Sequence, residues 1–372
     1  MLFRPVVGLM AAAQLALSAK LDKVADFGSN PSKINMYIYV PDKVATKPAV
    51  IVAVSTIPPW WCPPPLPFLL SLPRQWTHHP LQMHPCGGSG TGWYAGTRLP
   101  SYADSNGFIL IYPDTPNMSH CWDVQNAATL THGAGGDAAG IISSTLPSCP
   151  CRMSVPGEKE KKTSVFLCRR PGSTPVSSLL SAEAVTNAQA ARAVVKYTLQ
   201  KYSGDAERVY MMGSSSGGMM TNALAGSYPD VFEAGAAFSG IGFACASGQG
   251  QATPAAPNQT CAQGKINHTP KQWGDFVRNA YPGYTGRRPR LQIYHGLADS
   301  LVRPACATQA LQQWSDVLAL PWSKNVSGVP SAAYTQVIYG DGTKLEGFFG
   351  QGVGHTAPVN EQLMLKFFGI LK

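Results

Sequence analysis

Short apolar runs alternate with stretches of good helix formers along this chain of 372 residues. The apolar runs have the length of buried strands, and the stretches between them favour helices. We expect strands near residues 36–41, 49–54, 107–113, 208–213, 291–296 and 335–340. We expect helices near residues 192–202, 215–227, 270–280, 304–317 and 360–370. This alternation predicts an α/β fold with a mostly parallel sheet.

One segment combines a strand, a sharp turn and a helix around a serine. Its centre, Gly213-Ser214-Ser215-Ser216-Gly217, fits the pattern G-x-S-x-G, in which the middle serine lies on a strained turn. The glycines let the backbone bend tightly and leave room for a substrate. The pattern alone is common, but its strand–turn–helix context favours Ser215 as a nucleophile.

A serine hydrolase of this type also needs an acid and then a histidine, in that chain order. Asp299 follows the apolar run at 291–296, and His355 lies in a glycine-flanked loop before the last predicted helix. We expect His355 to take the Ser215 proton and Asp299 to orient His355. His295 is an alternative base, but it lies inside a predicted strand, which favours a packing role.

These motifs resemble those of the fungal acetylxylan and feruloyl esterases of carbohydrate esterase family one. The resemblance covers most of the chain and rests on residues 26–31, 36–41, 107–113, 121–124, 281–286 and 352–355, together with the serine segment. It implies a single-domain α/β-hydrolase fold, no cofactor, and the triad roles given above for Ser215, Asp299 and His355.

The resemblance also implies a substrate and a reaction. Residues 27–30 and 281–284 are most similar to those of acetylxylan esterases. We therefore expect deacetylation of xylan through an acyl-enzyme, by a monomer that acts on plant cell-wall polysaccharide. The alternative is a feruloyl esterase that releases ferulate from arabinoxylan, which would need a deeper aromatic slot.

An oxyanion hole needs two backbone N–H donors. One is expected from Ser216, and the other from the loop at 84–90, which resembles the family's His-x-Cys-x-Gly segment. That match leaves Cys86 and Gly87 both open as the second donor. Trp122 and Trp93 flank the loops expected near the serine, where an aromatic ring can stack on a sugar or a feruloyl group, or pack the base of a loop.

Two segments interrupt the family pattern, near residues 55–83 and 142–190. They have no regular period and are rich in proline, serine and cysteine. They are surface insertions, substrate loops or translated introns of a faulty gene model, and we favour the introns as a hypothesis. A chain whose oxyanion loop is displaced by residues 55–83 would be catalytically impaired. The cysteines of the second segment lack the partners of a metal site, so no metal is expected.

The N-terminus is typical of a secretory signal at 1–19, with Arg4 before an apolar run and small residues after it. This run is too short to cross a bilayer. The remaining residues, 20–372, would form the mature esterase domain. Glycosylation sequons occur at Asn117, Asn258, Asn267 and Asn325. The resemblance implies two disulfides, Cys86–Cys121 and Cys245–Cys261, which leaves Cys306 unassigned.

The formal net charge of +9 does not indicate a nucleic-acid partner. Residues 151–170, inside the second interruption, contain six basic and two acidic residues. Basic residues are nowhere interleaved with aromatic ones as nucleic-acid binding requires. We expect neither a nucleic-acid nor a membrane partner.

Overall fold

The computed structural model describes residues 21–28, 30, 32–54, 88–115, 120–141, 194–247 and 258–372. The predicted signal at 1–19 lies outside the described residues, as do the two interruptions at 55–83 and 142–190 and their cysteines. The predictions made for these segments therefore stay predictions.

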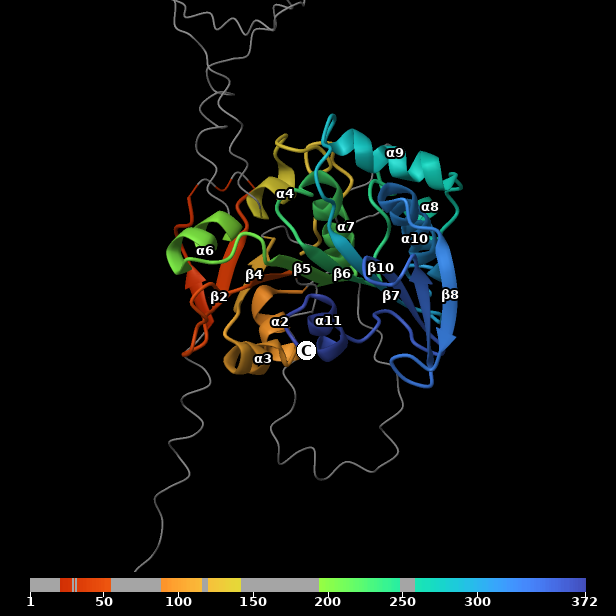
Figure 1. The fold of residues 1–372 in the computed structure, drawn as a ribbon. Coiled ribbons are helices and arrows are strands. Elements are labelled where there is room, and N and C mark those ends of the chain that lie inside the picture. Colours follow the sequence, from red (N-terminus) through yellow and green to blue (C-terminus); the bar gives the residue numbers. More distant parts are fainter. Residues whose placement is uncertain are drawn as a thin grey trace, which may run out of the picture.

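The described residues form one ten-stranded sheet in the order β1-β2-β4-β3-β5-β6-β7-β10-β9-β8 (Figure 1). The six strands from β4 to β10 in this order are parallel to one another, and the outer pairs are antiparallel. This confirms the predicted α/β class. The strands are β1 Leu21–Val24, β2 Asn35–Tyr39, β3 Val50–Val54, β4 Ile109–Asp114, β5 Val209–Ser214, β6 Ala234–Phe238, β7 Arg290–Gly296, β8 Trp322–Ser327, β9 Tyr334–Tyr339 and β10 Leu345–Gly350.

Helices cover both faces of the sheet (Figure 1). One face carries α4 Gly136–Ile141, α6 Val194–Tyr202, α7 Ser216–Ser227, α8 Gln259–Ala262, α9 Pro270–Ala280 and α10 Pro304–Leu318. The other carries α2 Gly90–Gly96, α3 Leu99–Asn106 and α11 Glu361–Phe367. Strand β3 shows why: Val50 and Val52 pack in the first core, whereas Ile51 and Ala53 pack in the second. A strand that is apolar on both sides needs helices on both.

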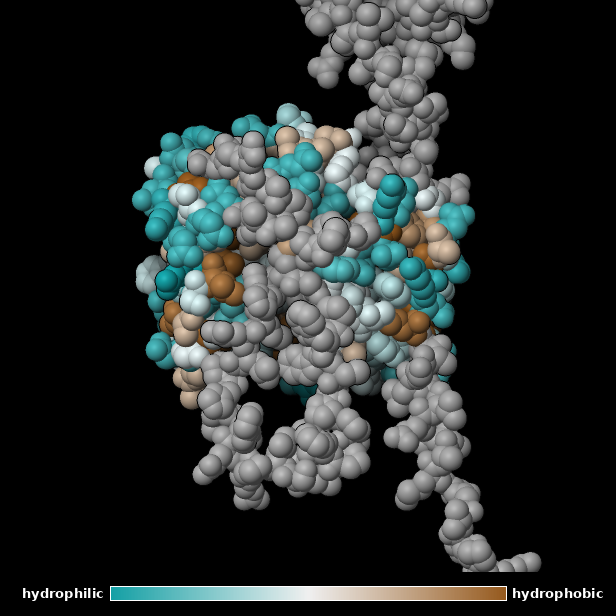
Figure 2. All heavy atoms as spheres, turned by 180° about the vertical axis from the view of Figure 1, so that it is seen from behind, coloured by the Kyte–Doolittle hydropathy of each residue, from teal (hydrophilic) through white to brown (hydrophobic). Residues whose placement is uncertain are grey.

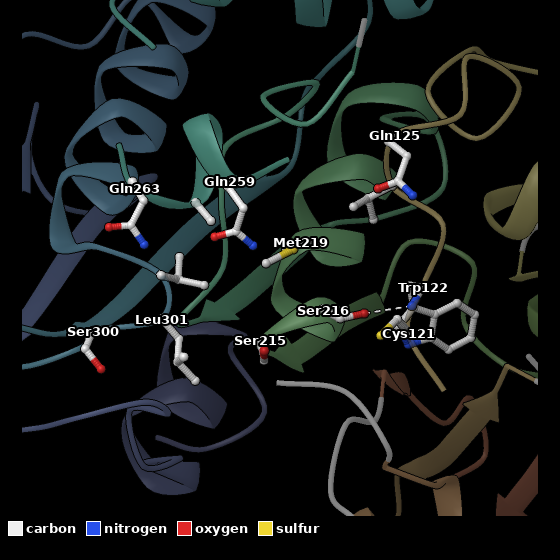
Figure 3. A pocket seen from close by; sticks show the side chains of 13 residues that line it. Cys121, Trp122, Gln125, Ser215, Ser216, Met219, Gln259, Gln263, Ser300 and Leu301 are labelled. Carbon is white, nitrogen blue, oxygen red and sulfur yellow. Dashed lines mark hydrogen bonds between the residues drawn. The ribbon is translucent and has the colours of Figure 1, made fainter. Parts of the chain in front are cut away.

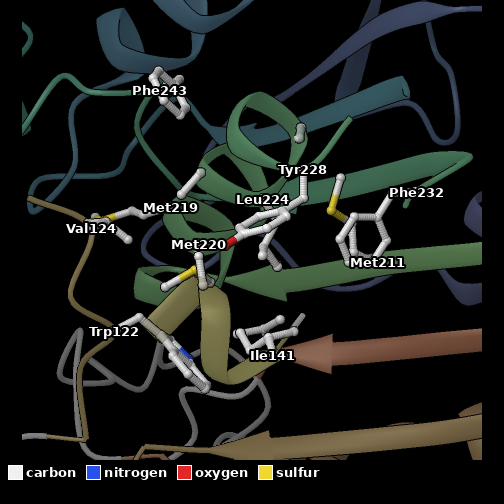
Figure 4. Close-up of a cluster of buried hydrophobic side chains, with 14 of the residues drawn as sticks. Trp122, Val124, Ile141, Met211, Met219, Met220, Leu224, Tyr228, Phe232 and Phe243 are labelled. Atoms are coloured by element: carbon white, nitrogen blue, oxygen red, sulfur yellow. The ribbon is translucent and has the colours of Figure 1, made fainter. Parts of the chain in front are cut away.

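Helix α7 lies at the centre of the first core. Figure 4 shows its residues Met219, Met220 and Leu224 among buried side chains from the loop after β4 and from α4. All residues of α7 are buried, so the helix is fixed by packing on every side. The helix that follows the predicted nucleophile is therefore a rigid part of the structure.

All predicted strands and helices are present, with bounds that differ by at most three residues. The prediction missed strands β1, β6, β8 and β10 and helices α2, α3, α4 and α8. Strand β6 reads Ala-Gly-Ala-Ala-Phe, which has little β propensity. Helix α2 contains three glycines, which are poor helix formers. Both elements form because of what packs against them.

On the face shown in Figure 2, hydrophilic residues cover most of the described surface, and hydrophobic residues form small separate patches. None of the helices in the described ranges combines the length and the apolar character that a bilayer crossing requires.

Glycines allow α7 to approach the sheet closely. A Cβ on Gly217 would collide with the carbonyl oxygen of Val54, and a Cβ on Gly218 would come within 2.6 Å of the carbonyl oxygen of Phe238. A Cβ on Gly213 would collide with the backbone of Gly217. The glycines of the G-x-S-x-G pattern are therefore required by backbone-to-backbone contacts.

We predict that Gly217→Ala destabilises the fold, because the added methyl must push α7 away from strand β3. Overpacking of this kind costs about 1–3 kcal/mol, which should lower the melting temperature by about 1–4 °C. Gly354→Ala is the matched control, since a Cβ there meets no atom within 4 Å. Equal melting temperatures for the two variants would contradict the close-contact argument.

Candidate active site

Ser215 stands between strand β5 and helix α7 with a left-handed backbone, φ 53° and ψ −120°. This conformation is unusual for a residue with a side chain and is a form of strain found at functional sites. The Ser215 N–H donates to the carbonyl oxygen of Phe238 at 2.8 Å, which holds the turn in place. The sharp turn is the one expected from the sequence pattern.

The structure brings Ser215, His355 and Asp299 together. His355 Nδ1 lies 2.7 Å from Asp299 Oδ2, and His355 Nε2 lies 2.8 Å from Ser215 Oγ. The three residues follow strands β5, β7 and β10, which are parallel, so they meet at the carboxyl edge of the sheet. This is the arrangement of a serine nucleophile, a base and an orienting acid.

The acid and histidine loops are joined through the backbone. The N–H of Leu297 donates to Gly350 at 2.8 Å, and the N–H of Ala298 donates to Val353 at 2.9 Å. The residues that form these bonds closely precede Asp299 and His355 in the chain. The separation between the carboxylate and the imidazole is therefore set by two strands that are paired throughout their length.

Hydrogen bonds keep Asp299 charged although it is buried. Burial alone raises the pKa of its carboxyl, but the bond to His355 and the N–H of Val302 more than offset this, and the pKa lies below its ordinary value. Oδ1 accepts from the N–H groups of Leu301 and Val302 at 3.0 and 2.9 Å. An ionised Asp299 accepts from His355 Nδ1–H, which leaves Nε2 free to accept the Ser215 proton.

His295 lies inside strand β7 and is fully buried. Its Nε2–H donates to the carbonyl oxygen of Val302 at 2.7 Å, and burial lowers its pKa. Its ring therefore packs as a neutral group, with Nε2 3.4 Å from Asp299 Oδ2. This packing role is the one expected for a histidine within a strand.

The loop after β4 is attached to the helix that carries the nucleophile. The N–H of Trp122 donates to the Ser216 hydroxyl at 2.7 Å. The next N–H, that of Asp123, donates to the buried Asp137 carboxylate on α4 at 2.9 Å. Burial raises the pKa of Asp137 to about 6. The loop is thus clamped between α7 and α4.

A pocket of about 130 Å³ opens beside Ser215 (Figure 3). Its apolar walls come from α7, from α8 and from the loops after β4 and β7. Amide side chains contribute the polar part of the lining. The lining residues are Cys121, Trp122, Val124, Gln125, Ser215, Ser216, Met219, Gln259, Ala262, Gln263, Ser300, Leu301 and Val302.

The predicted aromatic substrate contacts need correction. Trp122 lines the pocket, but it is only 1% exposed, and its indole lies within the core cluster (Figure 4). Trp93 is 2% exposed, and its indole N–H donates to the carbonyl oxygen of Val54 at 2.7 Å. Neither ring is placed to stack on a substrate, because both are buried among core side chains.

The oxyanion donors are placed only in part. Ser216 is the first residue of α7, where backbone N–H groups have no partner within the helix. Its N–H therefore remains a candidate donor. Cys86 and Gly87 lie outside the described residues.

The expected disulfide Cys245–Cys261 is present, with a Cα–Cα distance of 5.7 Å. It fixes α8, which forms one wall of the pocket. Cys121 is also disulfide-bonded, but Cys86 lies outside the described residues. Cys306 is a buried free thiol that donates to the carbonyl oxygen of Cys261 at 3.1 Å. Burial raises its pKa to about 12, so this thiol is unreactive.

The predicted glycosylation sites differ in their exposure to solvent. Asn267 and Asn325 are exposed. Asn258 is buried and caps α8, and its Nδ2, the atom that would carry a glycan, is inaccessible. The prediction for Asn258 is therefore not supported in the folded chain. Asn117 lies outside the described residues.

Comparisons with known proteins agree with this geometry. The Prolyl oligopeptidase family model matches residues 186–318. Feruloyl esterase B of Neurospora crassa is 52% identical over 371 residues, with full coverage of both chains. Acetylxylan esterase A of Aspergillus ficuum is 31% identical over 371 residues, or 99% of this chain and 94% of the relative. The chain belongs to the family of feruloyl esterase B and acetylxylan esterase A.

A solved structure of this family supports the fold. The acetyl xylan esterase from Aspergillus awamori aligns with a TM-score of 0.69 and 30% identity, over 94% of this chain and 99% of the other. The resemblance and the α/β-hydrolase fold expected from the sequence are thereby confirmed. The chain is a carboxylic ester hydrolase of the serine hydrolase class.

The sequence did not indicate the residues that shape the pocket. Met219 has the pattern of an ordinary helix residue, Gln125 and Leu301 lie in loops, and Gln259 begins the short helix α8. One sequence feature pointed toward this wall, the cysteine pair at 245 and 261, since a disulfide there fixes the segment that contains Gln259.

We predict that Asp137→Asn stabilises the protein at pH 8 and leaves its stability unchanged at pH 4. The folded pKa of about 6 exceeds the unfolded value near 3.9. The folded state therefore binds more protons between these values, and stability falls as pH rises through this window. The penalty reaches its full size as pH rises past 6 and is on the order of 3 kcal/mol.

Asparagine carries no charge and keeps an oxygen acceptor for the Asp123 N–H. Melting temperatures of both proteins at pH 4 and pH 8 test this prediction. A difference of the same size at both pH values would show that the buried charge is not its source.

Proposed function

We propose that this chain is a secreted serine esterase that releases ferulate from feruloylated plant cell-wall polysaccharide. The observation that carries the proposal is its higher identity to feruloyl esterase B, 52%, than to acetylxylan esterase A, 31%, over nearly the same residues. This reverses the order that the sequence motifs alone favoured, since deacetylation of xylan was the first expectation and ferulate release the alternative.

The pocket supports an aromatic acyl group. A dry cavity of about 150 Å³ holds one benzene ring, and the volume beside Ser215 is about 130 Å³, so the pocket encloses most of one ring and leaves the remainder of a feruloyl group outside it. Apolar side chains such as Met219 and Val302 line it. A polysaccharide cannot enter a space of this size, so the acid part of the ester occupies it and the sugar chain stays outside.

The triad geometry supports a two-step reaction. Ser215 Oγ attacks the ester carbonyl while its proton passes to His355 Nε2, and ionised Asp299 stabilises the resulting imidazolium. The carbonyl oxygen becomes negative and accepts hydrogen bonds from the Ser216 N–H and from the segment of Cys86 and Gly87. The first turn of α7 adds the positive end of its helix dipole at this point.

The intermediate then breaks down. His355 gives its proton to the sugar hydroxyl, which leaves, and the acid remains bound to Ser215 as an ester. Water next loses a proton to His355 and attacks the acyl-enzyme, which releases the free acid and restores Ser215. No cofactor takes part in either step.

Deacetylation of xylan is the second candidate. It is supported by the structural likeness to an acetyl xylan esterase at a TM-score of 0.69. An acetyl group is smaller than the pocket, so the pocket volume does not discriminate against it. The acyl group that the enzyme releases fastest separates the two candidates.

Ser215→Ala should abolish ester hydrolysis, because no other described group is placed to form the acyl-enzyme. Asp299→Asn should lower kcat by about 10³- to 10⁴-fold, since an amide favours the wrong tautomer of His355. Both rates can be measured with 4-nitrophenyl acetate. Unchanged turnover by Ser215→Ala would contradict the assignment of the nucleophile.

We expect the chain to release ferulate from feruloylated arabinoxylan faster than it releases acetate from acetylated xylan. The same assay with a version that lacks residues 55–83 and 142–190 tests the role of these segments. Higher activity of the shortened chain would support the translated-intron hypothesis and the impaired-chain alternative. Equal activity would contradict both, and dominant acetate release would favour deacetylation.

Secretion, monomeric state and glycan occupancy are part of the same proposal. Secretion is supported by the N-terminal pattern at 1–19 and by the disulfide Cys245–Cys261, and glycan occupancy by the exposed sequons at Asn267 and Asn325. Disulfides of this kind persist in oxidising compartments.

A further inference from the structure

The acyl pocket has a polar part that the triad does not use. Gln125 follows the clamped Trp122 loop, and Gln259 begins α8. In Figure 3 their side chains lie on opposite sides of Met219, and both are separate from the Ser215 hydroxyl. Both residues line the pocket, so an acyl group bound at Ser215 extends toward them over Met219.

The amide of Gln125 lacks a partner. Its Nε2 is buried, and no group in the described part of the chain accepts a hydrogen bond from it. A buried donor without an acceptor is unfavourable, and native structures rarely retain one without a reason. An oxygen atom on a ligand in the pocket would satisfy this donor. Gln263 differs, since its Oε1 already accepts from Arg303 Nε at 3.2 Å.

The two amides offer complementary chemistry. Each glutamine side chain has two N–H donors and one carbonyl acceptor. A ring hydroxyl both donates and accepts, whereas a methoxyl oxygen only accepts. A 4-hydroxy-3-methoxyphenyl ring therefore matches one amide that donates and one that accepts, while its carbon face lies on the Met219 thioether, a favourable contact.

We propose that Gln125 and Gln259 determine specificity for the acyl group, by hydrogen bonding to the ring oxygens of a hydroxylated or methoxylated cinnamoyl ester. This inference rests on the proposed function and names the part of the substrate that the pocket recognises. The backbones of both walls are held, that of Gln125 by the contacts of its loop with Ser216 and Asp137 and that of Gln259 by the Cys245–Cys261 disulfide. The Gln259 side chain is exposed, so it can reorient to meet the ligand.

The test compares kcat/KM for three esters: methyl ferulate, methyl cinnamate without ring oxygens, and 4-nitrophenyl acetate. The full chain, Gln125→Leu and Gln259→Leu are assayed, with Gln312→Leu as the matched control. Gln312 lies on α10 outside the pocket lining. The ratio of ferulate to cinnamate activity does not depend on how much of a variant is folded.

We expect the full chain to prefer methyl ferulate, and each pocket variant to lose about five- to tenfold of that preference, the effect of one hydrogen bond. Gln125→Leu should also keep or raise activity on methyl cinnamate, because it removes the unpaired amide. For Gln312→Leu, both the activity on 4-nitrophenyl acetate and the ratio of ferulate to cinnamate activity should stay within about twofold of the full chain, since a change below 0.5 kcal/mol is usual for a neutral site.

A ratio that is unchanged in Gln125→Leu and Gln259→Leu, while the full chain still cleaves methyl ferulate, would overturn this inference and leave the proposed function intact. Cleavage of 4-nitrophenyl acetate alone by the full chain would overturn the ferulate assignment, and this inference with it.

Discussion

The contact between helix α7 and the backbones of β3 and β6 sets the geometry of the whole site. It is possible only because residues 217 and 218 have no Cβ. The helix can then begin directly at the end of β5, with Ser215 on a left-handed turn. The first N–H groups of the helix face the same point as the serine hydroxyl. This turn fixes the Ser215 hydroxyl, with which His355, Asp299 and the pocket must all be aligned.

The two walls of the pocket are held in place by different kinds of interaction. The wall that contains Gln125 is held by polar contacts, from Trp122 to the Ser216 hydroxyl and from Asp123 to Asp137. The wall that contains Gln259 is held by a covalent bond at Cys261. The floor is Met219, one turn beyond the nucleophile on α7. Each wall therefore has its own link to the core of the enzyme.

Sequence patterns correctly predicted the elements whose conformation is determined by their own residues. Strands β3, β5 and β7 are runs of apolar residues, and Ser215, Asp299 and His355 stand at strand ends in a fixed chain order. Strand β6 was missed because its small residues have little preference of their own for a strand.

The tryptophans show where such patterns fail. Trp93 and Trp122 lie close to the site in sequence terms, but tertiary packing decided that their rings are buried. The residues around 125 and 259 are brought together only by the complete fold. The proposed role of these residues in acyl preference depends on that meeting of distant segments, which no local motif records.

The two backbone hydrogen bonds between the loops after β7 and β10 have an evolutionary consequence. They join the loops that contain Asp299 and His355 without involving residues 125 and 259. Substitutions at residues 125 and 259 can therefore arise in evolution without altering the backbone link between the acid and the base.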